Sequence, residues 1–416
     1  MATDRKRRKI QVNKTKAEKP KKTPKIKVHT NDNDENGGVS RLKVLNGTKK
    51  RRKIIRIISY SVIAAVVVAL IVVNALTPTG LIETLQNNYT ALGSGSFPIK
   101  VYATNASYLS SWNNNIAIVN DTFFEVYNDS GKLMQAVSHG MSNPQLEFSE
   151  ERYLLFDRNR YNLSVYNYSD ELYSREFDNI IVSADIGRDG TYAVAVDSDT
   201  YQNTVRVYNK DNESICAWNL ANYYVTDVAV SNNGDNVAVS LIDSKDGAFQ
   251  SYLYIYDIQK NSPIFTYTFS EIVSSLTCCG DDYLLLNGFD RAYAVNWEGG
   301  AELNLNINGT VRCYDNEVSG LSCIAFGRAD NEQVNSITVL GETGNIISSF
   351  QINNIITDIS MSEDMIVVLS SNNVYCYNLN GELVDSYDTA LKGRFVAVNS
   401  SNNIFLLDNT DLMNVN

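Results

Sequence analysis

Arginine and large aromatic side chains recur in five polar segments of this 416-residue chain. Both residue types are favoured at binding interfaces, and function concentrates on variable loops that a rigid scaffold carries. These positions therefore predict a binding surface, with ordinary solvated loops as the alternative. The predicted surface residues are Arg158, Arg160, Tyr161, Tyr201, Phe249, Phe289, Arg291 and Arg328.

Catalytic chemistry has little support among the other polar residues. Beyond residue 96 the only histidine is His139, in the stretch SHGMSNP, which we interpret as a connection between repeated units. A Ser-His-Asp triad would need that histidine beside a nucleophile. Paired carboxylates of the glycosidase type need a defined separation, and no spacing singles out a pair. We predict no catalytic residues and a protein that is not an enzyme, with a glycan-active enzyme as the least favoured alternative.

Metal and disulfide chemistry are weakly indicated as well. The six cysteines all lie in predicted strands, and no Cys-x-x-Cys spacing occurs among them. A free cysteine is commonly buried, and only Cys313 and Cys323 are placed to pair. Asp197–Thr200 and Asp243–Gly247 offer oxygen ligands, but neither completes a twelve-residue calcium loop. The sequence predicts no cofactor and no metal, and it leaves the Cys313–Cys323 bridge open.

A recurring phrase supplies the scaffold for these residues. A β-rich run ends in Tyr or an aliphatic residue, then Asn, Asp or Gly, then a turn. Between the first and last occurrence the spacing averages 40 residues, and such self-similarity is typical of repeat architectures. The anchors of the phrase are Tyr127, Tyr166, Tyr208, Tyr256, Val295, Leu340, Tyr377 and Leu407.

Each repeat contains four short strand candidates. The clearest reads TDVAVS, NVAVSLI, YLYIYD and IFTYTF, and the first pair is joined by the turn NNGD. Alternation of apolar and polar residues indicates half-buried strands, and Gly and Asn pairs suit hairpin turns. Four strands in each repeat of about 40 residues predict an all-β fold, a β-propeller. We predict eight blades, with seven as the alternative and two β-sandwiches as the second choice of fold.

The ends of the predicted domain indicate how the ring closes. After Lys392 only two strands, RFVAV and IFLLD, are recognisable, while FPIKV at 97–101 belongs to no other unit. We therefore predict that 97–101 supplies the outer strand of the last blade. With strands named A to D from the axis outward, the short A–B and C–D turns share one face. The B–C segments, which carry the predicted surface, share the other face, and the chain before residue 97 enters at the short-turn face.

A long apolar run precedes the repeats. Residues 57–82 contain no Asp, Glu, Lys or Arg, and a helix needs roughly 20 apolar residues to cross about 30 Å of hydrocarbon. A cleaved signal peptide, with a site at Val73–Ala75, and a buried core helix are less favoured. We predict a transmembrane helix at 54–76. A disordered basic tail at 1–53, a linker at 77–96 and a propeller at 97–416 complete the predicted domains.

Charge gives the predicted orientation. Residues 1–56 carry 20 Lys and Arg against 5 Asp and Glu, whereas the remainder carries 16 against 42. Positive residues next to a span stay in the cytoplasm, so the tail is predicted inside and the propeller outside the cell membrane. Basic runs such as DRKRRK resemble nucleic-acid patches, but a nearby membrane favours anionic lipid. The predicted partners are the lipid bilayer and a protein or cell-wall glycan, with no nucleic acid.

The turns GRDGTYAVAV and SNNGDNVAVS, each followed by a VYN or IYD strand, resemble those of WD-like and quinoprotein-type propellers, although the Trp-Asp signature is absent. Together with the basic tail and single span, the chain resembles an uncharacterised family of membrane-anchored propellers, a domain of unknown function, from low-GC Gram-positive bacteria. The resemblance implies the fold and no functional residues. The favoured function is a cell-surface binding scaffold. A sensor or assembly subunit that couples ectodomain binding to the cytoplasmic tail is the main alternative.

Overall fold

A computed structural model describes residues 40–101, 106–149, 151–245, 247–289, 291–300, 303–305, 309–315, 320–328, 331–371, 373–389 and 393–415. The chain divides into two compact units, residues 1–69 and 70–416. The predicted tail covers residues 1–53. Residues 1–39 lie outside the described residues, and residues 40–53 belong to the first helix.

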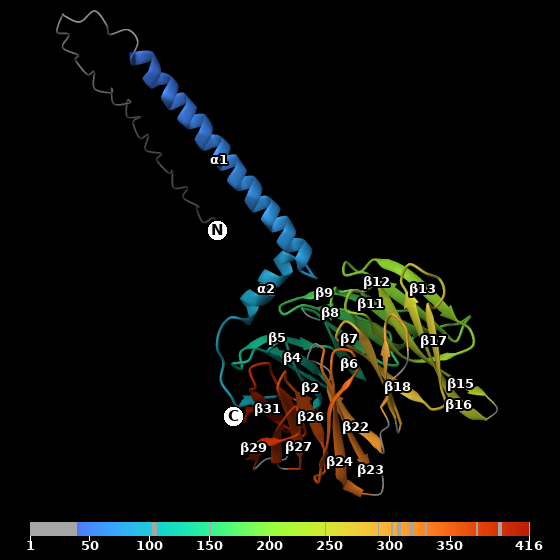
Figure 1. Cartoon of the computed structure of the whole chain (residues 1–416). Coiled ribbons are helices and arrows are strands. Elements are labelled where there is room, and N and C mark those ends of the chain that lie inside the picture. Colours follow the sequence, from blue (N-terminus) through green and yellow to red (C-terminus); the bar gives the residue numbers. More distant parts are fainter. Residues whose placement is uncertain are drawn as a thin grey trace, which may run out of the picture. The chain divides into compact units, whose positions relative to one another are not determined.

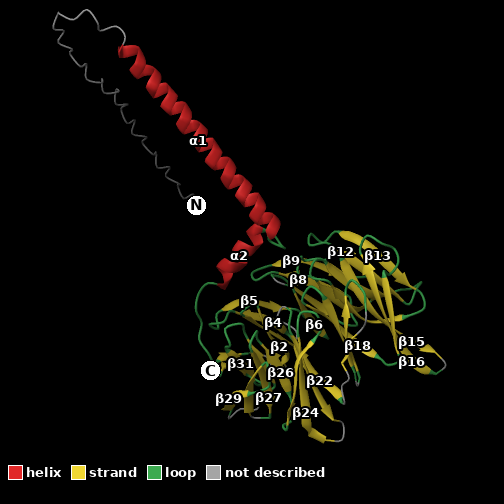
Figure 2. Cartoon of the chain, in the orientation of Figure 1, coloured by secondary structure: helices red, strands yellow, loops and turns green. Residues whose placement is uncertain are grey.

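Two helices precede the strands (Figure 2). Helix α1 spans Ser40–Leu76, and its segment Arg51–Asn74 has a mean hydropathy of 2.6 with no part of it buried inside the protein. Within the described residues it is the one helix long and apolar enough to cross a membrane. Helix α2 spans Leu81–Ala91 and lies in the segment for which the sequence predicted only a linker.

After the two helices, the described strands form eight antiparallel four-stranded sheets that follow one another round a ring (Figure 1). Blade 1 contains β2 (Ala106–Trp112), β3 (Asn115–Asn120), β4 (Phe123–Tyr127) and β5 (Leu133–Ser138). Blade 2 contains β6 (Pro144–Phe148), β7 (Tyr153–Asp157), β8 (Asn162–Tyr166) and β9 (Glu171–Glu176). Blade 3 contains β10 (Ile181–Ile186), β11 (Tyr192–Asp197), β12 (Asn203–Tyr208) and β13 (Ser214–Leu220). Blade 4 contains β14 (Tyr224–Val230), β15 (Asn236–Lys245), β16 (Ala248–Asp257) and β17 (Phe265–Phe269).

The second half of the ring repeats this plan. Blade 5 contains β18 (Val273–Cys279), β19 (Tyr283–Gly288), β20 (Ala292–Asn296) and β21 (Leu303–Leu305). Blade 6 contains β22 (Thr310–Asp315), β23 (Ser322–Arg328), β24 (Asn331–Leu340) and β25 (Ile346–Ile352). Blade 7 contains β26 (Asp358–Met361), β27 (Met365–Ser370), β28 (Asn373–Asn378) and β29 (Leu383–Asp388). Blade 8 contains β30 (Phe395–Val398), β31 (Ile404–Leu407), β32 (Asp411–Asn414) and β1 (Ile99–Lys100).

The predicted all-β propeller with eight blades is confirmed, and the alternatives of seven blades and of two sandwiches are excluded. The core lies between neighbouring sheets, because each cluster of buried side chains draws on two adjacent blades. The second strand of a blade is covered on both faces, so β11 and β19 are buried along almost their whole length. The outermost strand β29 is instead exposed at every residue except Tyr387, which is partly buried.

The closure of the ring is also confirmed. Strand β1 pairs antiparallel with β32, so Ile99 lies opposite Leu412, and the N–H of Val101 donates to the carbonyl of Thr410 at 2.8 Å. The sequence analysis found only two strands after Lys392 and missed the third, β32. The first seven repeat anchors lie in the third strand of their blade, whereas Leu407 ends the second strand of blade 8. Its short spacing from Tyr377 reflects that difference.

The disulfide bridge between Cys313 and Cys323, which the sequence left open, is absent, since all six cysteines are free. Cys313 pairs across the sheet with Ala325, and Cys323 pairs with Asp315. The two cysteines are thus diagonal neighbours, roughly 7–8 Å apart, whereas a disulfide needs Cβ atoms about 4 Å apart. Adjacent strands were correctly predicted, but the register separates the two sulfurs.

Candidate interaction site

The predicted surface residues all lie at second-to-third-strand connections, and these belong to five successive blades. Arg158, Arg160 and Tyr161 follow β7, Tyr201 follows β11, Phe249 begins β16, Phe289 and Arg291 follow β19, and Arg328 ends β23. Alternate connections of a propeller blade lie on the same face, so the eight residues share what we call the loop face. Residues 246, 290, 329 and 330 of these loops lie outside the described residues.

The four aromatic residues of this set are strongly exposed. Phe289 is 73 % exposed and Phe249 is 60 % exposed, while Tyr161 and Tyr201 are each 41 % exposed. A contiguous exposed group of large apolar side chains marks a binding surface, whereas these four are spread over blades 2 to 5. The loop face is therefore an extended surface and not one pocket.

Blade 4 extends this face furthest along its strands. Strands β15 and β16 each run for ten residues, and their pairing continues to Lys245 opposite Ala248. Phe249, the second residue of β16, lies opposite Ser244 near the tip of the hairpin. A hairpin longer than its neighbours presents its tip to a partner, and the side chain at this tip is apolar.

A hollow of 460 Å³ lies beside Phe289, between blades 5 and 6. Its lining includes Asn287, Arg312 and Tyr314. Asn287 is 2 % exposed, its amide nitrogen donates to Ser275 Oγ at 3.2 Å, and its side-chain oxygen has no partner among the described residues. The loop face therefore combines an exposed aromatic residue with a recess lined by polar and apolar residues.

Arg158 differs from the other three arginines, because it is only partly exposed whereas they are exposed. Asp227 lies in the central channel of the ring, which is described below. Burial raises the pKa of Asp227, and the positive charge of Arg158 partly opposes that rise. The positive charge of Arg158 therefore slightly favours the ionised form of this one interior carboxyl. His139 lies between blades 1 and 2, where its ring bonds to the carbonyl of Asn120 at 2.9 Å and accepts from the N–H of Met141 at 3.0 Å. Its predicted place in a connection is confirmed.

The innermost strands enclose a channel of 690 Å³ that the sequence analysis did not identify. Six carboxylates and one arginine, Arg188, are among the described residues that line it. Tyr314, at 38 % exposed, and Phe148 add aromatic surface. The channel is therefore strongly acidic. Its carboxylates are Glu147, Asp185, Asp227, Asp315, Asp358 and Glu363.

Four of these aspartates connect neighbouring blades. Each accepts a hydrogen bond from a backbone N–H of the next blade's innermost strand, whose inner edge has no paired strand of its own. The bonds join Asp185 to Val230 at 2.6 Å, Asp227 to Leu276 at 2.8 Å, Asp315 to Met361 at 2.9 Å and Asp358 to Val396 at 2.9 Å. A buried N–H without an acceptor costs about 1–3 kcal/mol, so these side chains stabilise the centre of the ring.

Burial perturbs the titration of these groups. It raises the pKa of Asp185 to about 7 against the lowering effect of its hydrogen bond from Val230, and repulsion from Asp227 adds to the rise. Burial also raises the pKa of Asp358 to about 7, with repulsion from Asp315 acting in the same direction. Raised carboxylate pKa values also occur in active sites, but here the carboxylates already serve as acceptors between blades.

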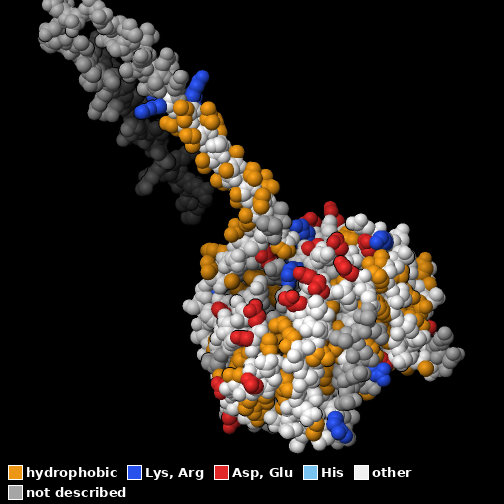
Figure 3. Space-filling model, viewed as in Figure 1, with side chains coloured by type: hydrophobic (Ala, Val, Ile, Leu, Met, Phe, Trp, Pro, Cys, Tyr) orange, Lys and Arg blue, Asp and Glu red, His pale blue; other side chains and the backbone are white. Residues whose placement is uncertain are grey.

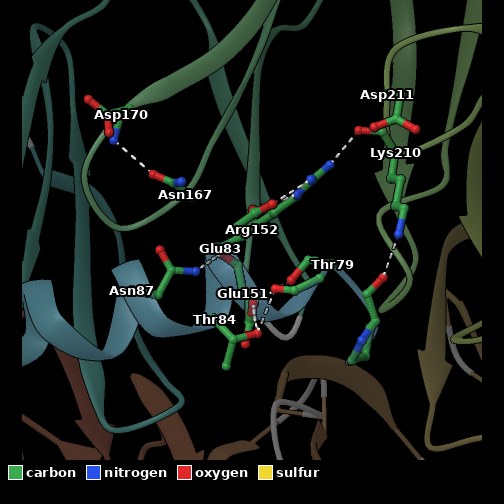
Figure 4. Close-up of polar contacts among 12 residues, drawn as sticks. Thr79, Glu83, Thr84, Asn87, Glu151, Arg152, Asn167, Asp170, Lys210 and Asp211 are labelled. Atoms are coloured by element: carbon green, nitrogen blue, oxygen red, sulfur yellow. Dashed lines mark hydrogen bonds and ion pairs between the residues drawn. The ribbon is translucent and has the colours of Figure 1, made fainter. Parts of the chain in front are cut away.

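The opposite face of the ring, which we call the short-turn face, carries the segment that precedes the propeller. Arg152, in the first turn of blade 2, binds both carboxylate oxygens of Glu83 of α2, at 2.8 and 2.7 Å (Figure 4). Its third nitrogen donates to the carbonyl of Lys210 at 2.6 Å. Burial alone would lower the pKa of Arg152, but the paired Glu83 more than offsets this and the pKa is raised.

Further polar contacts fix α2 along its length. Thr84 donates to Glu151 at 2.9 Å, and Thr79 binds the same oxygen. Asn87 accepts from the N–H of Tyr168 at 3.1 Å and donates to the carbonyl of Glu151 at 3.3 Å, so both ends of its buried amide are used (Figure 4).

The ends of the segment are held as well. Lys210 donates to the carbonyl of Pro78 at 3.3 Å, and Lys132 donates to that of Thr90 at 2.8 Å. Gly95 N–H donates to Ser130, in the C–D turn of blade 1, at 3.2 Å. Every one of these partners lies in an A–B or C–D turn of blades 1–3. The prediction that the chain enters the propeller at the short-turn face is confirmed.

Comparison with known proteins gives a family and a fold. Residues 96–416 match the family described as "Family of unknown function (DUF5711)". No curated protein matches the sequence. Many solved structures are similar in fold, and two of them illustrate the likeness. The C-terminal WD40 domain of Sif2 has 13 % identity and a TM-score of 0.54, covering 77 % of this chain and 99 % of that one. Sqt1 of Saccharomyces cerevisiae has 11 % identity and a TM-score of 0.54, covering 78 % and 100 %.

Proposed function

Since this chain belongs to the family of unknown function DUF5711, we propose its role from its own geometry, as a membrane-anchored scaffold. In this proposal the propeller binds a protein, a wall polymer or a glycan through its loop face. Propellers typically serve as interaction scaffolds, but a fold alone does not specify a partner. The proposal is therefore argued from the two faces of the ring.

The observation that carries the proposal is the asymmetry between these faces. On the short-turn face, the chain itself covers turns of blades 1–3 through α2 and the residues around it. On the loop face, Phe249 and Phe289 are exposed at 60 and 73 % with Arg160 and Arg291 also exposed. These exposed phenylalanine and arginine side chains thus lie on the face that the anchoring segment leaves free.

Membrane anchoring is supported by α1 and by charge. The segment Arg51–Asn74 is long and apolar enough to span a bilayer. Of the 36 Lys and Arg residues, 20 lie in residues 1–56, and the acidic propeller follows the span; this charge difference supports a cytoplasmic N-terminus and a propeller outside the cell membrane.

Crosslinking on intact cells tests the binding role. A variant with alanine at Arg158, Arg160, Phe249 and Arg291 should lose the crosslinked partner of the full-length protein. A matched variant with alanine at four exposed positions of the short-turn face, Asp129, Asp211, Glu213 and Glu382, should retain it. Loss with the second variant and retention with the first would contradict the proposed face.

A second role, as a sensor or assembly subunit, has one specific observation in its favour. The described segment between Pro78 and Gly95 is bound to blades 1–3 at both ends and in the middle, so it is no free tether. Movement of these blades on binding would act directly on the chain next to the span. Crosslinking from residues 1–53 that changes when the loop face is occupied would support this role, and an unchanged pattern would count against it.

We propose no enzymatic activity. The channel carboxylates that come closest to a catalytic constellation are engaged with backbone N–H groups of adjacent blades. Asp185→Asn and Asp358→Asn should therefore change stability and leave partner crosslinking unchanged. Glycan cleavage by the purified protein that these substitutions abolish would overturn this.

A further inference from the structure

Helix α2 has its polar and apolar sides reversed with respect to an ordinary surface helix. Four apolar residues at spacings of three, four and three form one stripe, and they are exposed. Ile82 is 81 %, Leu85 is 59 %, Tyr89 is 78 % and Leu92 is 66 % exposed. A helix on a soluble domain normally turns such a stripe toward the core.

The polar side of α2 explains the reversal. Glu83, Thr84 and Asn87 face the propeller and bind Arg152, Glu151 and the backbone of Tyr168. The ion pair is well buried, with 5 % of the Arg152 side chain and 14 % of the Glu83 side chain exposed. Because these contacts fix the rotation of the helix about its axis, the apolar stripe must face away from the ring. Figure 3 shows hydrophobic side chains on the outer surface of the molecule over α2.

The chain places this stripe next to the end of the apolar span. Asn74 is the last residue of the candidate span, and its side-chain oxygen accepts from the N–H of Leu81, the first residue of α2, at 3.1 Å. The N–H of Thr77 also bonds to the carbonyl of Val73 at 3.1 Å. Gly80 makes the corner possible with a φ of 112°, which other residues rarely adopt. Helix α2 therefore begins seven residues after the last residue of the candidate span.

We propose that α2 is an interfacial helix, which lies in the headgroup region of the membrane with Ile82, Leu85, Tyr89 and Leu92 toward the acyl chains. This inference rests on the proposed membrane anchoring. An amphipathic helix binds a bilayer with its apolar face about 5–10 Å into the headgroup boundary. A tyrosine suits that depth, because its ring is apolar and its hydroxyl reaches water.

The size of the stripe favours lipid over a second protein. An 11-residue helix is only about 16 Å long, and a stable protein interface buries about 800 Å² on each partner. One face of α2 falls short of that area. A bilayer surface, in contrast, is already supplied by the neighbouring span and requires no further contact.

In this arrangement helix α2 connects the membrane to the ring. Its apolar side contacts lipid, and its polar side holds turns of blades 1–3. The short-turn face of those blades lies nearest the bilayer, and the loop face is presented away from it. The proposed binding surface would thus be oriented by α2 and not by the span alone.

Depth-dependent fluorescence quenching in vesicles tests the inference on the full-length protein. Tyr89→Trp places an indole on the stripe, and Tyr224→Trp, where the native tyrosine is 58 % exposed at the start of β14, is the matched control on the loop face. The native Trp112, Trp218 and Trp297 are at most 8 % exposed and give a constant background. Each variant is reconstituted into phosphatidylcholine–phosphatidylglycerol vesicles with doxyl-labelled lipid.

We expect the added emission of Tyr89→Trp to be lost with doxyl groups near the headgroups and retained more with doxyl groups near the bilayer centre. The emission of Tyr224→Trp should persist with both. Adding Ile82→Gln and Leu85→Gln to Tyr89→Trp should restore the emission, while the protein stays in the membrane through α1.

Alkaline extraction separates failure of this inference from failure of the anchor. If the protein resists extraction but Tyr89→Trp is quenched no more than Tyr224→Trp, the anchor stands and the interfacial helix is refuted. If Tyr89→Trp is shielded from aqueous iodide but is not quenched by lipid labels, a protein covers the stripe and the inference is likewise wrong. If extraction releases the protein, the proposed anchoring fails and the interfacial helix fails with it.

Discussion

The two faces of the ring are built on the same strands, but one contacts helix α2 and the other presents exposed side chains. On the short-turn face, brief hairpins receive a helix from the same chain through an ion pair and a series of hydrogen bonds. On the loop face, longer connections present exposed arginine and aromatic side chains. A short turn can therefore hold another part of the chain, since the short turns of blades 1–3 bind helix α2.

Two arginines of blade 2 show the difference at single residues. Arg152 and Arg160 are eight positions apart, at opposite ends of β7. Arg152 is 5 % exposed and paired with Glu83, whereas Arg160 is exposed. The sequence analysis chose Arg160 because it lies in a second-to-third-strand connection, and it passed over Arg152, which lies in a short turn. The role of an arginine can therefore be inferred only when the acidic residue that pairs with it is known.

The largest expected effect comes from the closing strand, through which the chain leaves the short-turn face. Replacing residues 97–101 by Gly and Ser of equal length removes Val101 and the packing of Phe97 on Phe405. Each buried apolar side chain contributes about 1.5–3 kcal/mol, so the free energy of unfolding should fall by roughly 4 kcal/mol or more. Thermal unfolding measures this, and an unchanged melting temperature would refute closure by β1.

The next test compares the two arginines directly. Arg152→Met leaves Glu83 and the Lys210 carbonyl without their partner in a mostly buried site, which costs about 3 kcal/mol. Arg160→Met should change the free energy of unfolding by no more than about 0.5 kcal/mol. Melting curves and limited proteolysis of residues 77–96 measure the two outcomes.

A double-mutant cycle identifies the source of that loss. Glu83→Gln alone should destabilise, and adding it to Arg152→Met should cost little more, because the pair has already been broken. Additive losses would show that the two residues do not act together and that α2 is held by its other contacts.

The channel between the faces predicts a smaller, pH-dependent effect. The folded-state pKa values of Asp185 and Asp358, both about 7, lie above the ordinary value of 3.8. Between about pH 4 and pH 7 the folded state therefore binds more protons than the unfolded state, so stability falls as the pH rises. Above pH 7 this contribution is constant.

Asparagine substitution tests the sign of that dependence. Asp185→Asn and Asp358→Asn keep an oxygen acceptor for the N–H groups of Val230 and Val396, but they cannot ionise. The decline in melting temperature from pH 5 to pH 7.5 should become shallower in each variant. Asp129→Asn, which removes one exposed charge, is the control, and an equal change of slope in that variant would sink the assignment.

The smallest effect on stability is expected on the loop face. Phe249→Ser and Phe289→Ser remove side chains that are 60 and 73 % exposed, so the free energy of unfolding should change by no more than about 0.5 kcal/mol. Their effect should instead appear in partner binding. A loss of several degrees in melting temperature would mean that these residues pack within the fold and are not held free for a partner.

The sequence was sufficient for the ring because its packing repeats. Second strands such as YAVAVD are covered by a neighbouring sheet on each side, and this environment recurs from blade to blade. A local pattern with a regular period therefore predicted the number of blades, the strand that closes the ring and most of the other strands, although it missed β32. It also placed the eight candidate residues on their connections, although their role in binding stays a prediction.

The features that were missed depend on contacts distant in sequence. The stripe Ile82, Leu85, Tyr89 and Leu92 is visible in the sequence, but the segment looks like a linker until Arg152 is seen to bind Glu83, 69 residues away. The channel aspartates recur in SADI and TDIS, but only the closed ring shows that they accept from the next blade. Cys313 and Cys323 failed to pair for a related reason, since the register is set by the whole sheet.

Blade 8 has a consequence for the order in which the protein is made. Lys100 binds Asp411 across 311 residues of sequence, and β1 has no strand to pair with until β32 has been synthesised. The first seven blades can form before β32 has been synthesised, but the eighth cannot. The nascent domain therefore stays an open arc, with the edges of blades 1 and 7 uncovered, until residue 414 has emerged. A premature stop only a few codons before that point would remove little mass and leave the ring permanently unsealed.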